Sequence, residues 1–212
     1  MPKKDKDRLT ETTLDVIFST AMIEGETETM EGVSARQLRN AAKANMICRL
    51  KKQEAKTFFD RLPTAGEYFH TVSNGSFDYW SVLSVLIDLC PGPVDEAYIS
   101  TWTINHNTCK ELFEVLDAGK VRKVWLLSGL YFKKREPAVY ARLATGLAER
   151  GQRIKCSENH AKVAVLIGAG FTVTMEGSAN LTANPRIEQN VVTGSPEVAA
   201  FHSAWMREII EA

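Results

Sequence analysis

The chain has 212 residues, of which 44% are hydrophobic and 25% are charged, and its formal net charge at pH 7 is zero. These values are ordinary for a folded globular protein, and they exclude a low-complexity chain or one that is strongly basic throughout. The length is enough for one substantial core, or for one domain with an extension.

No segment predicts secretion or membrane insertion. The N-terminal stretch MPKKDKDRLTETT is charged and leads into no long apolar run, and residues 81–89 are too few to span a membrane. The four cysteines show neither C-x-x-C pairing nor a metal-like spacing with histidine. They are Cys48, Cys90, Cys109 and Cys156. We therefore expect a soluble cytoplasmic protein with reduced thiols and no membrane association.

Residues 1–78 are expected to form a mostly helical N-terminal extension. A short amphipathic helix is predicted over residues 11–23, and Ser34 with Gln37 matches a capping box before a long helix over residues 35–60. The basic residues of this long helix are Arg36, Arg39, Lys43, Arg49, Lys51, Lys52 and Lys56. Two interpretations of them stay open, a surface that binds a partner or nucleic acid and a solvated face around a packed stripe.

The extension is predicted to end with a strand over residues 67–72, in which His70 is interpreted as structural. A helix over residues 77–89 follows, and Pro91 with Gly92 ends it. From residue 93 strands and helices alternate. The predicted strands cover residues 94–104, 121–129, 152–158, 160–167, 171–177 and 188–192.

Three further helices are predicted between and after these strands. The first is capped by Asn107 and stops at Gly119, the second runs from Pro137 to Arg150, and the last begins at Ser195. In the last helix the inward stripe is expected to be Val198, Phe201, Trp205 and Ile209. The alternation predicts an α/β domain over residues 79–212, with helices on both sides of a mixed sheet.

Side chains suited to phosphate chemistry gather between residues 160 and 188. His160 and Lys162 are two apart, so on a strand they would project from the same face. Gly177 would let the backbone approach a ligand, and Ser178 and Asn180 add a hydroxyl and an amide. A nucleophile, a cation and neutral donors together indicate a pocket for a phosphate ester.

These residues resemble a known family. His160 and Lys162 followed by G-S-x-N at residues 177–180 are similar to the signature of the phospholipase D superfamily, H-x-K-x4-D followed by G-S-x-N. The stretch NLTANPRIEQNVV resembles the small, single-motif bacterial nuclease branch. The resemblance covers residues 79–212. It departs where the motif aspartate would fall, because Ile167 stands there, and the segment between Lys162 and Gly177 is a few residues longer.

The resemblance implies a phospholipase D-like fold and roles for five residues. His160 would be the nucleophile that forms a phosphohistidine, or the acid that protonates the leaving oxygen. Lys162, Ser178 and Asn180 would hold the non-bridging oxygens, and Glu188 would orient the histidine. The chemistry uses no metal and no cofactor. Because the chain carries one motif, the resemblance also implies a homodimer in which two copies of His160 meet, with residues 133–135 near the rim.

Other polar residues are interpreted more conservatively. His106 lacks a lysine two residues later; Trp102, Asn105 and His106 are either substrate contacts or, for the histidine, part of a helix start. His202 is expected to be partly exposed, and Glu176 is given no role. No acidic or His/Cys cluster has the spacing of metal ligands.

The sequence thus predicts a metal-independent phosphodiesterase, most simply a nuclease acting on DNA through a phosphohistidine in a homodimeric site. DNA is favoured over lipid because the chain has a basic N-terminal helix and no apolar membrane-binding signal. The alternative is a catalytically impaired module that keeps the phosphate pocket to bind nucleic acid.

Overall fold

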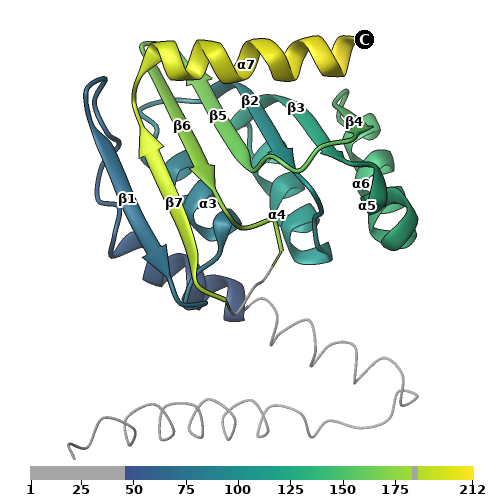
Figure 1. Cartoon of the computed structure of the whole chain (residues 1–212), viewed down its shortest axis with the longest axis horizontal. Coiled ribbons are helices and arrows are strands. Elements are labelled where there is room, and N and C mark those ends of the chain that lie inside the picture. The colour runs from purple at the N-terminus through teal and green to yellow at the C-terminus, as the bar shows by residue number, and fades with distance from the viewer. Residues whose placement is uncertain (1–45, 183–185) are drawn as a thin grey trace, which may run out of the picture. The chain divides into compact units, whose positions relative to one another are not determined.

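A seven-stranded mixed sheet forms the centre of the chain in the computed structural model, which describes residues 46–182 and 186–212 (Figure 1). The strands are β1 (Tyr68–Ser73), β2 (Val94–Thr101), β3 (Val121–Gly129), β4 (Arg153–Ser157), β5 (Val163–Gly168), β6 (Phe171–Gly177) and β7 (Glu188–Thr193). Their order across the sheet is β1-β7-β6-β5-β2-β3-β4. Strands β2, β3 and β4 are parallel, and the other neighbours are antiparallel. One edge of the sheet therefore collects the carboxyl ends of β2, β3, β4 and β6 and the starts of β5 and β7.

Helices cover both faces of this sheet (Figure 1). They are α3 (Tyr79–Leu89), α4 (His106–Asp117), α5 (Leu130–Arg135), α6 (Pro137–Glu149) and α7 (Pro196–Glu211). Residues 46–56 are also helical. Helix α7 crosses several strands on one face, and α3, α4 and α6 lie on the other.

The two faces are covered by separate apolar layers, because successive side chains of a strand point to opposite faces. In β2, Ala97 and Ile99 join the larger layer, whereas Tyr98 between them joins the layer under α7. In β5, Ala164 and Val165 divide in the same way. The uninterrupted apolar runs of the central strands follow from this burial on both sides.

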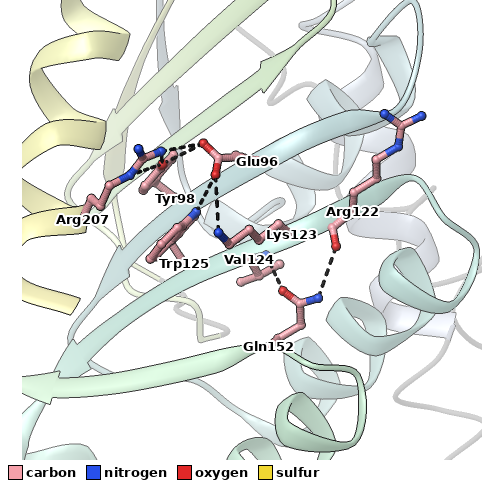
Figure 2. A network of polar contacts seen from close by, with 8 residues as sticks. All are labelled: Glu96, Tyr98, Arg122, Lys123, Val124, Trp125, Gln152 and Arg207. Carbon is pink, nitrogen blue, oxygen red and sulfur yellow. Dashed lines mark hydrogen bonds and ion pairs between the residues drawn. The ribbon is translucent and has the colours of Figure 1, made fainter. Parts of the chain in front are cut away.

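A charged and aromatic cluster anchors α7 to the sheet (Figure 2). Arg207 of α7 donates to Glu96 over 2.7 Å and also contacts the hydroxyl of Tyr98. The rings of Tyr98 and Trp125 stack with centroids 5.6 Å apart, and Trp125 donates to Glu96 over 3.1 Å. Burial raises the pKa of Glu96. The combined effect of the hydrogen bonds from Tyr98 and Trp125 and the charges of Arg207 and Lys123 is larger and opposite, so its pKa lies below the usual value.

The side chain of Gln152, just before β4, adds contacts to the pairing of β4 with β3 (Figure 2). Its carbonyl oxygen accepts from the Val124 amide over 2.7 Å, and its amide donates to the Arg122 carbonyl over 3.2 Å. Both groups of the glutamine side chain therefore satisfy backbone groups of β3 just before β4 begins.

The inward face of α7 differs from the predicted stripe. The side chains that α7 buries are Ala199, His202 and Met206. Phe201 is 68% exposed, which contradicts its prediction, whereas Trp205 and Ile209 pack partly against the sheet as expected. The face is rotated because His202, predicted to be partly exposed, is buried.

The burial of His202 is stabilised by polar partners at both of its ring nitrogens. Its Nε2 lies 3.0 Å from the carboxylate of Glu176 on β6, and its Nδ1 accepts from the Trp205 indole over 3.1 Å. Glu176 therefore has a structural role that the sequence did not reveal. A buried imidazole costs little when both nitrogens are hydrogen-bonded.

Most predicted elements are present, with shifted ends. The strands over residues 121–129 and 171–177 are confirmed to the residue, but β5 begins at Val163 and not at residue 160. The cap of α4 is Asn105, whose side chain accepts from the Thr108 amide over 2.8 Å, and not Asn107. Helix α5 was not predicted. The helix predicted to reach residue 60 ends at residue 56.

Residues before the boundary expected at 78 and 79 contribute to the same sheet and core. Strand β1 pairs with β7, and Ala55 and Phe59 are buried in the larger apolar layer. Lys51 and Lys52 form ion pairs with Asp78 and Asp88, so these two basic residues fix the helix to its neighbours. The helix predicted over residues 11–23 and the first part of the helix over 35–60 lie outside the described residues.

Among the described residues, no helix combines the length and the apolar character that crossing a bilayer would require.

Candidate phosphate-binding site

The sheet brings the five predicted site residues to one edge. His160 and Lys162 precede β5, Ser178 and Asn180 follow β6, and Glu188 begins β7. Because β5 and β7 run antiparallel to β6, these three positions lie side by side. The same edge carries the carboxyl ends of β2 and β3, where α/β sheets commonly bind ligands.

His160 and Lys162 contact each other directly. The Lys162 ammonium lies 2.9 Å from His160 Nδ1 and 3.4 Å from Nε2, and it also donates to the His160 carbonyl. The alternation expected for a strand is not the cause, because both residues precede β5. His160 is exposed and Lys162 is partly buried.

Asn159 holds the segment before β5 in place, and sequence reasoning missed it. Its amide donates to Ser100 Oγ over 3.0 Å and to the Thr101 carbonyl over 3.1 Å. Its carbonyl oxygen accepts from the Ala161 amide over 3.1 Å. Ser100 is fully buried at the end of β2. His160 is thereby fixed to the central strand on the side away from solvent, and no feature of the motif signals this contact.

The segment after β6 places Ser178 and Asn180 by alternation. Ala179 and Leu181 are buried in the larger apolar layer, so Ser178 and Asn180, which alternate with them, point the other way. The Asn180 carbonyl oxygen accepts from the Trp102 amide over 3.2 Å, and Thr101 Oγ1 accepts from the Leu181 amide over 3.2 Å. The sequence could have revealed this alternation, because it is a simple period of two.

Trp102 connects the two halves of the site. Its ring centroid lies 5.8 Å from that of His160, and its backbone holds Asn180. Asn105 is the α4 cap and His106 is exposed at the first position of that helix. Trp102 was one of three loop residues whose contact with substrate stayed open, and it is the one that touches the histidine.

Ser178 and Glu188 are paired with each other. Ser178 Oγ donates to Glu188 Oε2, and it accepts from the Gln189 amide over 3.1 Å. Glu188 also lies near Lys162 and raises its pKa, although burial lowers that pKa more strongly. The net effect leaves the pKa of Lys162 below its usual value. The expected role of Glu188 in orienting His160 stays a prediction.

The close approach at Gly177 is to the protein. A Cβ there would lie 2.6 Å from Asn190 Oδ1 and 2.8 Å from the Tyr79 ring. Tyr79 is fully buried and donates to the Met175 carbonyl over 2.9 Å. Glycine is therefore required for packing behind Ser178, and the approach to a ligand that the sequence suggested stays a prediction.

Metal and thiol chemistry have few candidates here. In residues 46–182 and 186–212, no three His, Cys, Asp or Glu side chains are placed to hold a metal ion. All four cysteines are free. Burial raises the pKa of Cys109 to about 12, so its thiol stays protonated at neutral pH.

Ile167, which replaces the motif aspartate, lies far from His160 at the other end of β5. It packs with Val163 and Val165 in the layer under α7. Its neighbour on β2 is Glu96 and its neighbour on β6 is Thr172. The replacement therefore changes the support of α7, and the five residues at the opposite edge keep their contacts.

Comparison with known proteins gives a likeness of fold. No protein-family model and no curated protein sequence matches the chain. Polyphosphate kinase from Porphyromonas gingivalis aligns with a TM-score of 0.50 and 16% identity, over 68% of this chain and 26% of the kinase. The chain thus corresponds to about a quarter of that enzyme's length.

Two smaller proteins align over nearly their whole length. Nuc, a phospholipase D family member from Salmonella typhimurium, aligns with a TM-score of 0.49 and 16% identity, over 68% of this chain and 94% of Nuc. NucT from Helicobacter pylori aligns with a TM-score of 0.47 and 14% identity, over 68% of this chain and 97% of NucT. The described part of the chain has the predicted α/β class: a mixed sheet flanked by helices on both faces.

We expect Ile167→Asp to lower the free energy of unfolding by about 1–3 kcal/mol, because it places a carboxylate in an apolar layer opposite Glu96. The matched control Ile167→Asn has a similar volume and no charge, so the difference between the two variants reports the charge. Repulsion from Glu96 raises the pKa of the new carboxylate above its unfolded value. The extra cost of aspartate is then present at pH 7 and shrinks as the pH falls through that raised pKa.

Urea unfolding of both variants at pH 7 and pH 4.5 measures these differences. An aspartate variant as stable as the parent at pH 7 would contradict the account, because it would mean that Arg207 can serve a second carboxylate.

Proposed function

We propose that the chain is a metal-independent phosphodiesterase that cleaves DNA through a phosphohistidine. The observation that carries the proposal is the contact of Lys162 with His160 at 2.9 Å, beside the side chains of Ser178 and Asn180. An imidazole next to an ammonium and neutral donors suits a phosphate, which needs a nucleophile on phosphorus and donors on its non-bridging oxygens.

In the proposed reaction, a ring nitrogen of His160 attacks phosphorus and forms a P–N bond while the P–O bond to the leaving group breaks. The leaving oxygen takes a proton from a second histidine. Water then attacks phosphorus, the P–N bond breaks, and the proton of the water returns to that second histidine. The Lys162 ammonium has three N–H donors. When substrate binds, their hydrogen bonds can change partner from His160 to the phosphate oxygens.

The second histidine is proposed to be His160 of another copy of the chain. His202 lies on α7 and is buried against β6. His70 lies on β1, the outermost strand at one side of the sheet. His106 is exposed at the start of α4, but it has no lysine two residues later. A two-fold dimer in which the carboxyl edges of the two sheets face each other would supply both histidines to one phosphate.

DNA is proposed as substrate because basic and aromatic residues border the site. Lys133, Lys134 and Arg135 form the last turn of α5, which directly follows β3 at the same edge, and they are exposed. A local basic surface attracts a polyanion even when the whole chain is neutral. The described basic residues of the N-terminal helix contribute less than expected, since Lys51 and Lys52 are paired.

One observation favours a second function. Ile167 stands where the resemblance places an aspartate, so the chain is alternatively a module that binds nucleic acid through the phosphate pocket without cleaving it. The position of Ile167 at the far end of β5 supports the active interpretation, because the replacement leaves the contacts of His160 and Lys162 intact.

We expect purified protein to cleave plasmid or single-stranded DNA in excess chelator, and His160→Ala to lose at least about a thousandfold in rate because the nucleophile is removed. The matched control is His70→Ala, which removes an exposed histidine from β1 and should keep the parental rate. Gel assays of DNA cleavage with and without chelator measure both effects.

Cleavage that requires added Mg²⁺, or that survives in His160→Ala, would refute the proposed mechanism. If the parent binds DNA in a salt-dependent manner and cuts none, the binding module is the better account.

We expect the protein to be a dimer whose activity needs both copies of His160. Light scattering at micromolar concentration should give about twice the chain mass of 23.6 kDa. After exchange of subunits in an equal mixture with His160→Ala, activity per wild-type chain should fall by about half, since about half of those chains sit in mixed dimers. The same mixture made with His70→Ala should show no loss. A monomer, or mixing without loss, would remove the two-histidine mechanism.

A further inference from the structure

A cavity of about 370 Å³ opens beside the candidate site. It is enclosed by the segment between β2 and α4, by α5 with the start of α6, and by the segment after β6. Two of its lining residues, Trp102 and Asn180, belong to the phosphate site as well. A ligand in the cavity would therefore lie next to a phosphate held at His160, whose ring is 5.8 Å from that of Trp102.

The aromatic and basic lining of this cavity suits the flat ring of a nucleobase. Tyr131 borders it and is 68% exposed, an unusual position for a tyrosine that covers no core. The guanidinium of Arg135 lies 5.8 Å from the Trp102 ring centroid. Aromatic faces and guanidinium groups are the surfaces on which proteins stack unpaired bases. Glu136 and His106, also at the rim, offer groups that can hydrogen-bond to base edges.

Trp102 is held rigidly enough to act as a platform. Its carbonyl accepts from the Gly129 amide over 3.2 Å, and a Cβ at Gly129 would lie 2.4 Å from the indole ring. The glycine thus lets the ring lie against the end of β3. Tyr131, by contrast, belongs to the short helix α5 and projects into solvent. One wall of the cavity is fixed and the other is exposed.

We propose that this cavity is a stacking subsite for an unpaired nucleobase adjacent to the scissile phosphate, so that the substrate is single-stranded nucleic acid. A base in a duplex is stacked and paired, and it cannot enter a side cavity without being flipped out. A lipid is a poorer fit, because the lining carries Arg135, Glu136 and His106. This proposal rests on the proposed function for the position of the phosphate, but its test does not require cleavage.

The test measures binding in the His160→Ala background, so that the oligonucleotide stays intact. Fluorescence anisotropy compares a labelled deoxythymidine oligomer of about ten nucleotides with an abasic oligomer of the same length and charge. We expect the oligomer with bases to bind about five- to a hundredfold tighter, the range for stacking one base on an aromatic side chain. When each oligomer is paired with a complementary strand, this difference in affinity should disappear.

Tyr131→Ala in the same background should remove most of the preference and leave the affinity for the abasic oligomer unchanged. Its exposure means that the substitution leaves the core intact. The matched control is Tyr68→Ala, which removes another exposed tyrosine, 54% accessible, from β1 at an outer edge of the sheet. That variant should keep the full preference.

Equal affinities for the two oligomers, an equal effect of the two tyrosine substitutions, or no binding of the single strand would each overturn the subsite. The proposed function fails separately. If wild-type protein cleaves the abasic oligomer in a His160-dependent manner but shows no preference for bases, the phosphodiesterase stands and the subsite falls. If the preference for bases is found and no oligomer is cleaved, the stacking subsite stands and the phosphodiesterase falls.

Discussion

The pairing of β5 with β2 is the constraint on which the candidate site depends. Strand β5 runs antiparallel to β2, with Val163 opposite Ser100, so the chain that enters β5 meets the chain that leaves β2. His160 and Lys162 are thereby placed at the carboxyl edge of the parallel strands. Asn159 then links the two segments through Ser100 and Thr101. Shifting this register by one residue would turn every side chain of β5 to the other face and break the contact.

The two ends of β5 have different surroundings. At the start of β5 lie the polar residues, which contact one another, and at its end lies Ile167 against α7. At the carboxyl end of β6 the polar side chains also divide, since Glu176 contacts His202 of α7 whereas Ser178, just after the strand, contacts Glu188. The opposite face of the sheet presses Tyr79 against Gly177 and so fixes the backbone on which Ser178 stands.

The pattern of local residues was enough to predict the α/β class and most strands, whereas the roles of the five site residues stay a prediction. Periodicity and turn residues are local signals, and strands β3 and β6 were found to the residue. The errors came from contacts between distant segments. The burial of His202 was missed because its partner Glu176 lies 26 positions away in the sequence. With His202 facing the sheet, its neighbour Phe201 points outward.

Short-range chemistry also misled where two similar residues compete. Asn105 and Asn107 both suit a helix cap, and only the turn after β2 decides between them. Helix α5 has six residues and buries only Phe132. It is therefore too short to show an apolar period. Asn159, which holds the segment before β5 in place, lies next to His160 but outside the pattern of residues that suggested the site.

Two opposing effects act on the ammonium of Lys162. Burial lowers its pKa, and the charge of Glu188 only partly opposes that effect. The same ammonium contacts His160, and Ser178 donates to Glu188. The polar groups of the candidate site are therefore held in contacts with one another.

The central claim is that His160 becomes covalently bonded to phosphorus during turnover. Rapid acid-free quenching of the protein with a phosphodiester substrate, followed by peptide mass spectrometry, tests it directly. The account predicts an adduct on the peptide that contains His160, in which phosphorus still carries the ester group that is not the leaving group, and predicts its absence from His160→Ala. Turnover without any adduct on His160, or with the adduct on another residue, would contradict it.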